Sequence, residues 1–250
     1  MKNIFIRKWF LETATLIKKY LFYLCFSLVF GKSLPLKVGE TLLYNASFRG
    51  IHAANASLKT IKKEVIGIDS VYHIRFRAKS RGPINYIFPI DDEINLWIDI
   101  KTFLPIKIHE KISEGKFQRS RMIHFNRKNN FALINDDTLR IEKNTQSPFS
   151  LFYFFRKNSI GEFKDKEISL IQNNKAVHLN LIVRENEIIN VPAGEYTCSI
   201  VSPEKKNNKN FKNKAELDVM FSNDVKKYPV KIRLKLKYGY LVMELEKIIS

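Results

Sequence analysis

The sequence predicts an all-β fold: a single strongly curved, mainly antiparallel sheet or half-open barrel of about ten to twelve strands, with one short aromatic helix. Three observations support this prediction. Apolar and polar residues alternate through most of the chain from residue 36 onward, which is the period of a strand with one covered face. Turn-forming residues separate the alternating segments. One segment, 147–156, breaks the alternation with a helix start followed by aromatic residues on every side.

Two segments show the strand pattern most clearly. Segment 71–79 places every second residue from Tyr72 to Ala78 on an apolar face, and segment 229–238 does the same from Val230 to Tyr238. Weaker alternation occurs at 41–48, 56–61, 93–100, 106–112, 119–125, 177–183 and 196–201. Gly, Pro, Asn and Asp residues lie between these segments and form turns. One apolar face per strand predicts an antiparallel sheet that is covered on a single side.

The opposite faces of the two clearest strands are basic. Cations occupy every second position of both strands, at Arg75, Arg77, Lys79, Lys231, Arg233, Lys235 and Lys237. Cations at this spacing lie about 7 Å apart and repel one another unless they face water or anions. Two interpretations stay open. The faces are either solvated, or they dock on an anionic membrane or an envelope protein, at about 1 kcal/mol for each basic residue near the lipid.

A short helix is predicted where Ser147 precedes Pro148, because serine caps helix N-termini and proline is tolerated at the first helical position. A helix that is apolar on all sides must be buried or in contact with lipid. We expect burial, with the helix filling the concave face of the sheet. The side chains expected to line or plug this face, and so to form a ligand site, are Phe149, Phe152, Tyr153 and Phe155. Arg156 is expected at the mouth of this site as a contact for an anion.

The first 33 residues predict export. A basic region precedes the uncharged run 21–30, which is followed by the small residues Gly31 and Ser33, and this is the pattern of a secretory signal peptide. The run is shorter than the roughly 20 residues that span a bilayer. We therefore expect a signal peptide at 1–33 and a single β-rich domain at 34–250, located in the periplasm or cell envelope. The alternative is an uncleaved N-terminus that anchors the chain to the inner membrane.

Export restricts the partners of this basic chain. The 250 residues contain 43 Lys and Arg against 25 Asp and Glu, a net charge of +18. An exported protein rarely meets nucleic acid, so the anionic partners that remain are lipid head groups, glycans and acidic proteins. The lysine- and asparagine-rich stretch 204–214 is interpreted as a solvated hairpin loop. Cys198 has no partner in the exported part of the chain, so the fold must form without a disulfide.

The sequence contains no recognisable motif for catalysis, metal binding or cofactor binding. Its five histidines lack metal-ligand spacing, and no nucleophile elbow, phosphate loop or dinucleotide fingerprint occurs. Adjacent acids such as Asp91 and Asp92 point to opposite faces of a strand and cannot easily share a proton. We therefore expect a non-enzymatic protein without metal or cofactor. A hydrolase that uses Ser222, Asp224 and a histidine is a minor alternative.

Short motifs follow one another in order along residues 38–245. They include Val38-Gly39-Glu40, Pro148-x-Ser150-x-x-Tyr153-x-x-Arg156, Val191-Pro192-Ala193-Gly194-x-Tyr196 and Ser222-x-Asp224 followed by Pro229-Val230. In order and coverage, these motifs resemble those of a bacterial family of exported proteins, the domain of unknown function 3108. The resemblance implies a periplasmic or envelope β-protein with no established activity.

Two functional hypotheses follow from these observations. In the first, the protein is a non-enzymatic envelope protein whose curved sheet binds a lipid, a lipidated partner or another apolar ligand. In the second, it is a structural or assembly factor that docks on an anionic membrane or a partner through its basic strand faces.

Overall fold

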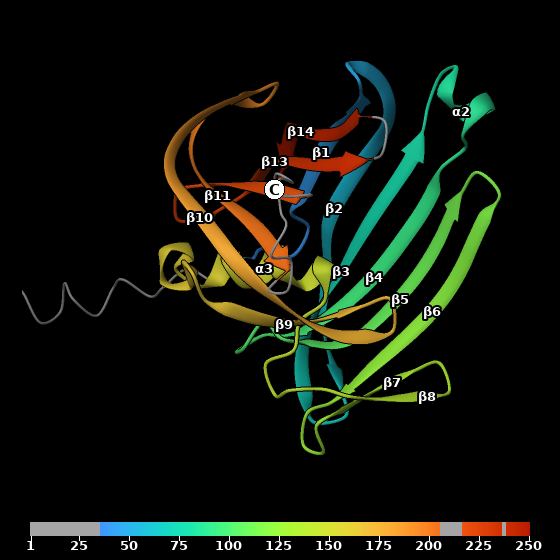
Figure 1. Ribbon diagram of the computed structural model, residues 1–250, viewed down its shortest axis with the longest axis vertical. Coiled ribbons are helices and arrows are strands. Elements are labelled where there is room, and N and C mark those ends of the chain that lie inside the picture. Colours follow the sequence, from blue (N-terminus) through green and yellow to red (C-terminus); the bar gives the residue numbers. More distant parts are fainter. Residues whose placement is uncertain (1–35, 206–216, 237–238) are drawn as a thin grey trace, which may run out of the picture. The chain divides into compact units, whose positions relative to one another are not determined.

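The computed structural model describes residues 36–205, 217–236 and 239–250 (Figure 1). The predicted signal peptide, most of the lysine-rich stretch 204–214 and Lys237 lie outside these residues. The described part forms one antiparallel sheet of fourteen strands. Their bounds are β1 (Thr41–Phe48), β2 (Ile51–Ile66), β3 (Asp69–Ser80), β4 (Asp91–Asp99), β5 (Pro105–Glu114), β6 (Phe117–Asn126), β7 (Phe131–Ile134), β8 (Asp137–Arg140), β9 (Glu167–Gln172), β10 (Lys175–Val191), β11 (Gly194–Lys205), β12 (Leu217–Ser222), β13 (Pro229–Leu236) and β14 (Gly239–Ile249).

The predicted all-β antiparallel fold class is confirmed, and the sheet has more strands than the alternation indicated. β7 and β8 are only four residues long, which is too short to show a period. β12 is buried along nearly its whole length, so it lacks the polar positions of an alternating strand. These strands become visible only through their pairing with neighbours.

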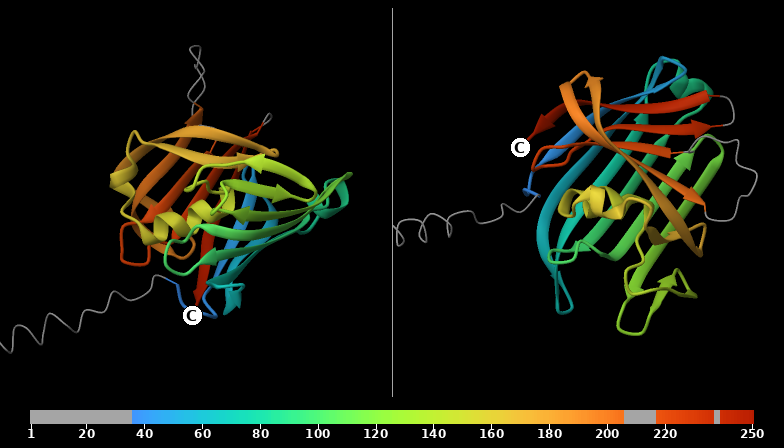
Figure 2. Two further views of the ribbon diagram at one scale, coloured as in Figure 1. Left: turned by 90° about the horizontal axis from the view of Figure 1, so that it is seen from below. Right: turned by 60° about the vertical axis from the view of Figure 1, so that its left-hand side comes forward.

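The order of strands in the sheet is β8-β7-β6-β5-β4-β3-β2-β1-β14-β13-β12-β11-β10-β9. Most strands pair with the strand that precedes or follows them in the sequence, as in a meander. The exception is the pairing of β1 with β14, which joins the two ends of the described chain in the middle of the sheet. The edges of the sheet are therefore β8 and β9, and the sheet curves until these edges face each other (Figure 2).

The concave face of the sheet carries the main hydrophobic core. Cross-strand pairing places Leu42, Leu58, Phe76 and Ile94 in one row on this face, from β1 to β4. A second buried cluster lies on the β9–β13 side and includes Leu181, Val219, Phe221 and Ile232. Each strand contributes every second residue to the concave face, as its alternation predicts.

Helix α3 (Pro148–Lys157) lies across the opening between the two halves of the sheet (Figure 2). Ser147 caps it as predicted: its side chain accepts from the Ser150 N–H, and the Ser150 hydroxyl accepts from the Ser147 N–H in return. Phe152 packs against both hydrophobic clusters, so the helix connects them. The remaining helical segments of the described residues are α2 (Ile84–Ile87) and the 3-10 helix η1 (Ile160–Phe163). No described helix is long and apolar enough to span a membrane.

The two edges of the sheet are joined by the segment between β8 and α3. Gln146 pairs with β9 through two backbone hydrogen bonds, of 2.8 Å to Ser169 O and 3.0 Å from Ile171 N. Arg127, directly after β6, donates to the carbonyl oxygens of Pro105, Lys143 and Thr145 at 2.6–3.0 Å. This clamp holds the segment against the start of β5. Burial lowers the pKa of Arg127 to about 10, so the guanidinium is still charged at neutral pH.

We expect Arg127→Met to lower the free energy of unfolding by about 2 kcal/mol, because it leaves three backbone carbonyls without their charged donor. Arg127→Lys should recover only part of the loss, since a single ammonium cannot reproduce the planar fork of donors. Urea unfolding followed by circular dichroism measures both effects. Lys128→Met, at the exposed neighbour, is the control and should leave stability within about 0.5 kcal/mol of the original. Equal stability of the Arg127→Met and Lys128→Met variants would contradict the clamp.

Candidate functional site

The concave face has an apolar wall that is only half-buried at one end. Phe48, Leu241, Leu234 and Leu217 form a continuous cross-strand row over β1, β14, β13 and β12. All four are half-buried, as are Phe76 and Ala78 on the same face of β3. Deeper in the sheet, residues of this face such as Leu42 and Tyr44 are fully buried. Apolar surface on the concave face is therefore still available at this end.

A second wall of the concave face, which begins on β4 beside the apolar residues of β3, is charged. Strands β4, β5 and β6 each place charged side chains on the core-facing side, where Ile94, Ile108 and Ile123 are buried. These charged residues are Asp92 on β4, Glu110 on β5, and Arg119 and Arg121 on β6. Charged residues on the core side of a strand are rare because removing a charge from water is costly unless it is paired. This wall is the strongest candidate for a functional site among the described residues.

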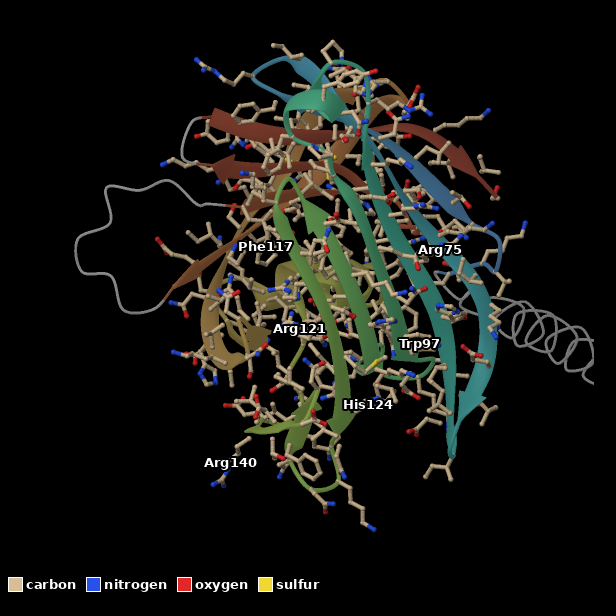
Figure 3. All side chains as sticks on the ribbon, turned by 90° about the vertical axis from the view of Figure 1, so that its right-hand side faces the viewer. Arg75, Trp97, Phe117, Arg121, His124 and Arg140 are labelled. Atoms are coloured by element: carbon tan, nitrogen blue, oxygen red, sulfur yellow. The ribbon has the colours of Figure 1, made fainter. Side chains whose placement is uncertain are left out.

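Glu110 is the centre of the charged wall. Its carboxylate accepts two hydrogen bonds from Arg121, of 3.0 Å from Nε and 2.8 Å from Nη2, and a weaker one of 3.3 Å from Arg119 Nη2. Arg121 also donates to Asn174 Oδ1 at 2.7 Å, which fastens the β9–β10 turn to this wall. Figure 3 shows Arg121 halfway along β6, between Phe117 and His124.

Arg119 differs from Arg121 in having unused donors. Its side chain is 38% exposed, whereas that of Arg121 is 8% exposed. The Arg119 Nε has no hydrogen-bond partner among the described residues, and its guanidinium lies 5.8 Å from the centre of the Phe117 ring. Two guanidinium groups thus share one carboxylate, which leaves an excess of positive charge on the partly exposed Arg119.

Asp92 adds a carboxyl group whose charge depends on pH. Its Oδ1 accepts from the Ser113 N–H at 2.9 Å. The pKa of Asp92 is raised to about 6, chiefly by burial and also by the neighbouring carboxylates of Glu114 and Asp91, against the lowering effect of the Ser113 bond. In the sheet, Asp92 is paired with Ala78 on β3. Near neutral pH, Asp92 is therefore mostly ionised, and its negative charge is destabilised by burial.

The predicted ligand residues of α3 lie among the core side chains. Phe149 packs against Phe76 of β3 with 5.5 Å between ring centres, and Phe155 contacts Phe221 of β12 at 5.7 Å. Tyr153 and Phe155 are fully buried, whereas Phe149 and Phe152 are half-buried. A ligand-binding role for these four aromatic residues stays a prediction, and the half-buried pair is the more accessible.

Arg156 lies inside the core and not at an open mouth. Only 2% of it is exposed, and its guanidinium forms two hydrogen bonds with the buried Glu40, at 2.6 and 3.1 Å. It also donates to Lys226 O at 2.9 Å and lies between the rings of Tyr153 and Tyr228. An anionic ligand at Arg156 would have to displace Glu40. The geometry makes this residue a link between α3 and the residue before β1.

Burial also raises the pKa of two tyrosines around this ion pair. Tyr44 donates its hydroxyl hydrogen to Pro229 O at 2.8 Å, and its pKa lies well above the ordinary value because the ring is fully buried. Burial likewise raises the pKa of Tyr153. Both phenols are therefore neutral over the physiological range and act as hydrogen-bonding parts of the core.

The predicted basic strand faces are largely paired with acids of neighbouring strands. Arg77 and Lys79 both lie 3.5 Å from Asp91 on β4. Lys231 contacts Glu244 at 2.7 Å, and Arg233 pairs with Asp218. Among the described residues, Arg75 and Lys235 of these stripes have no ion-pair partner. Docking on an anionic membrane or an envelope protein through these faces stays a prediction, and the free charge on them is smaller than the sequence indicated.

Ser222 and Asp224 serve the turn between β12 and β13. The Ser222 Oγ accepts from the Tyr228 N–H at 2.8 Å, and Asp224 accepts from the N–H groups of Lys226 and Lys227. No histidine of the described residues is hydrogen-bonded to Ser222.

Within the same residues, no group of three or more His, Cys, Asp and Glu could hold a metal ion. Burial raises the pKa of the Cys198 thiol to about 11, so this thiol is unreactive at neutral pH.

The charged wall was missed in the sequence analysis, although its signature is present there. On β5, Glu110 takes the alternate position between Ile108 and Ile112, on the apolar face of the strand. On β6, Arg121 lies two residues before Ile123 and therefore on the same face. A charge on the apolar positions of an alternating strand is the pattern that could have identified this site. The pairing of Arg121 with Asn174, 53 residues away, could not have been inferred in this way.

Comparisons with known proteins agree with this fold. A family model described as "Protein of unknown function (DUF3108)" matches residues 43–246. The β-barrel-like protein of domain of unknown function DUF1849 from Brucella abortus is similar with a TM-score of 0.53 and 11% identity, over 84% of this chain and 97% of that chain. At this identity, the likeness shows the fold alone.

Two further solved structures are less similar. One is a candidate lipoprotein from Parabacteroides distasonis, with a TM-score of 0.40 and 11% identity over 86% of this chain and 97% of that chain. The other is a candidate exported protein with a YmcC-like fold from Bacteroides fragilis, with a TM-score of 0.38 and 9% identity over 87% and 98%. A comparison with curated protein sequences gives no significant match.

We expect Glu40→Gln to destabilise the protein by about 3–5 kcal/mol, because it removes the carboxylate charge that Glu40 places against the buried Arg156 guanidinium. The double variant Glu40→Gln/Arg156→Met should lose less than the sum of the two single variants. A double-mutant cycle measured by urea unfolding gives the coupling energy. The half-exposed pair Lys231–Glu244 is the matched control, and its cycle should give less than about 1 kcal/mol. Strict additivity at Glu40 and Arg156 would contradict the buried link.

We expect Asp92→Asn to stabilise the protein by about 1 kcal/mol at pH 7.5 and by much less at pH 4. The pKa of Asp92 is higher in the folded state, at about 6, than in the unfolded state. Ionisation therefore costs stability as the pH rises from about 4 through 6, and the amide removes this cost while keeping the oxygen that accepts from Ser113. Unfolding curves at several pH values measure the difference. Asp91→Asn, at the adjacent exposed acid, should show no such pH-dependent gain.

Proposed function

This chain belongs to the DUF3108 family of proteins of unknown function, and we propose that it is an exported, non-enzymatic envelope protein that binds a lipid or another amphipathic ligand on the concave face of its sheet. The observation that carries this proposal is that an apolar wall and a charged wall adjoin each other on that face. One wall consists of half-buried apolar side chains, and the other holds Arg119 and its charged neighbours. Sites for amphipathic ligands combine these two features.

The apolar wall would take the hydrocarbon part of the ligand. The row from Phe48 to Leu217 and the side chains of Phe76 and Ala78 keep part of their surface exposed on the same face. Each CH₂ group buried against such a wall contributes about 0.8 kcal/mol. The half-buried aromatic rings of Phe149 and Phe152 extend this wall toward α3.

The charged wall would take the head group. Arg119 is the group best placed for this role, because its side chain is partly exposed and it shares the carboxylate of Glu110 with Arg121. A carboxylate or phosphate on the ligand would give its guanidinium a charge-assisted hydrogen bond. Glu110 and Arg121 would hold Arg119 in place, since all three share the same network.

Two features support the non-enzymatic and exported parts of the proposal. Ser222 and Asp224 are engaged in the turn before β13, which accounts for their side chains without catalysis. The basic N-terminal region, followed by a short apolar run and small residues, supports export to the periplasm or envelope.

The test uses dansyl-labelled undecanoic acid, an anionic amphiphile, and its uncharged methyl ester. We expect saturable binding of the acid to the full chain, and about tenfold weaker binding to Ala78→Phe, because the new ring fills space on the apolar wall. Lys79→Phe, on the opposite face of the same strand, is the control and should bind like the original protein. Arg119→Gln should weaken binding of the acid about tenfold but leave binding of the ester unchanged.

Mass spectrometry of the protein purified from cell envelopes without detergent tests the natural ligand. The proposal expects a bound amphiphile in about one copy per chain. The absence of a bound amphiphile, together with unsaturable binding of both probes, would overturn it. Thermal unfolding of each variant verifies that the substitutions leave the fold intact.

A further inference from the structure

A second surface lies at the end of the sheet where three turns meet. We call this end the rim: it consists of the β1–β2 turn (48–52), the segment 80–90 that contains α2, and the β5–β6 turn (114–117). The Arg81 N–H donates to Ala53 O at 3.1 Å, and the Gly115 N–H donates to Pro89 O at 2.7 Å, so each turn is attached to the next. The three turns lie together at the upper right of Figure 1.

The rim presents large apolar side chains to solvent. Each turn of the rim carries at least one such side chain. Ile51 lies on the β1–β2 turn, Tyr86 and Phe88 lie in the segment 80–90, and Phe117 lies at the β5–β6 turn. Tyr86 is 91% exposed and Phe117 is 53% exposed. A Cβ atom on Gly115 would lie 2.9 Å from the Phe88 ring, so Phe88 packs closely on the neighbouring turn. Apolar side chains that gather at one end of a molecule mark an interaction surface.

Basic residues surround these apolar side chains. The rim and the adjoining end of β3 carry Arg49, Arg77, Lys79, Arg81 and Lys116, against the acids Asp91, Asp92 and Glu114. Asp91 already forms ion pairs with Arg77 and Lys79. Within the described part of the chain, Arg49, Arg81 and Lys116 form no ion pair. The rim therefore combines exposed aromatic rings with unneutralised positive charge.

From this combination, we infer that the rim docks on the surface of an anionic lipid bilayer, with Tyr86, Phe88 and Phe117 entering the head-group region. Aromatic rings favour the boundary between head groups and hydrocarbon. Arg and Lys residues beside them are attracted to anionic lipids. Rim-to-rim contact between two copies would bring like charges together, which disfavours self-association through this surface. This inference does not rest on the proposed ligand, because Tyr86, Phe88, Arg81 and Lys116 belong to neither wall of the concave face, although the rim adjoins both walls at Phe48 and Asp92 and Phe117 lies beside Arg119.

The first test is co-sedimentation of the full chain with vesicles of phosphatidylcholine alone or mixed with phosphatidylglycerol. We expect binding to the anionic vesicles that weakens with salt, and about tenfold weaker binding for Tyr86→Ser/Phe117→Ser and for Arg81→Glu/Lys116→Glu. The matched control is Val65→Ser/Ile68→Ser, which changes two exposed apolar residues at the end of β2 and on the turn that follows it, at the other end of β3. Residues 1–35 are the same in all variants, so the differences report the rim.

The second test locates the contact directly, whatever the N-terminal segment contributes. Tryptophan is introduced by Phe117→Trp or by Ile68→Trp, and its fluorescence is quenched with brominated lipids in the anionic vesicles. The signal is the fluorescence that each variant shows beyond that of the original protein. For Phe117→Trp, we expect this signal to shift to the blue and to be quenched by the brominated lipids. For Ile68→Trp, we expect it to stay unquenched. Equal quenching in both variants would overturn the inference, as would a rim-dependent dimer in sedimentation velocity without quenching. Saturable dansyl-acid binding in either case would leave the proposed function standing.

Discussion

A curved sheet that does not close must still cover its apolar concave face and both of its edges, and most of this structure serves that requirement. In an ordinary barrel, the last strand pairs with the first and no edge is left. Here the last strand, β14, also pairs with the first, β1, but β8 and β9 do not pair with each other, and these two edges are joined by Gln146 and the Arg127 clamp. Helix α3 then covers the opening between the halves, anchored to the start of β1 by the ion pair of Arg156 with Glu40.

The two buried charge networks have different physical meanings. The Glu40–Arg156 pair is almost fully removed from water and has each partner satisfied, so it specifies where the helix sits. The network around Glu110 is less complete, because Arg119 is partly exposed and keeps a buried Nε without a hydrogen-bond partner among the described residues. On the same wall, burial raises the pKa of Asp92. A protein tolerates such local violations mainly where function requires them. This contrast is the reason for placing the ligand site on the charged wall.

The basic residues behind the net charge of +18 are paired with acids on some strands and unpaired on some turns, which the sequence alone did not indicate. Along β3 and β13, three acids on adjacent strands form ion pairs with four of the six described cations of the stripes, so these stripes are largely cross-strand ion pairs. Unpaired cations instead gather on turns at the rim, beside exposed aromatic rings. Charge on a turn has fewer neighbouring strands that could supply a counter-ion, so it stays available for an external anion.

Local periodicity in the sequence was enough to determine the fold class, the start and length of α3 and the face on which most strand residues lie, because these properties depend on residues close together in the chain. The motif order also determined the family. Only the tertiary structure decided which strands pair, since β1 and β14 lie at opposite ends of the described chain. It also decided that Arg156 meets Glu40 across 116 residues and that Arg121 meets Asn174. Such contacts depend on how the whole sheet curves, and that is a property of all its strands together.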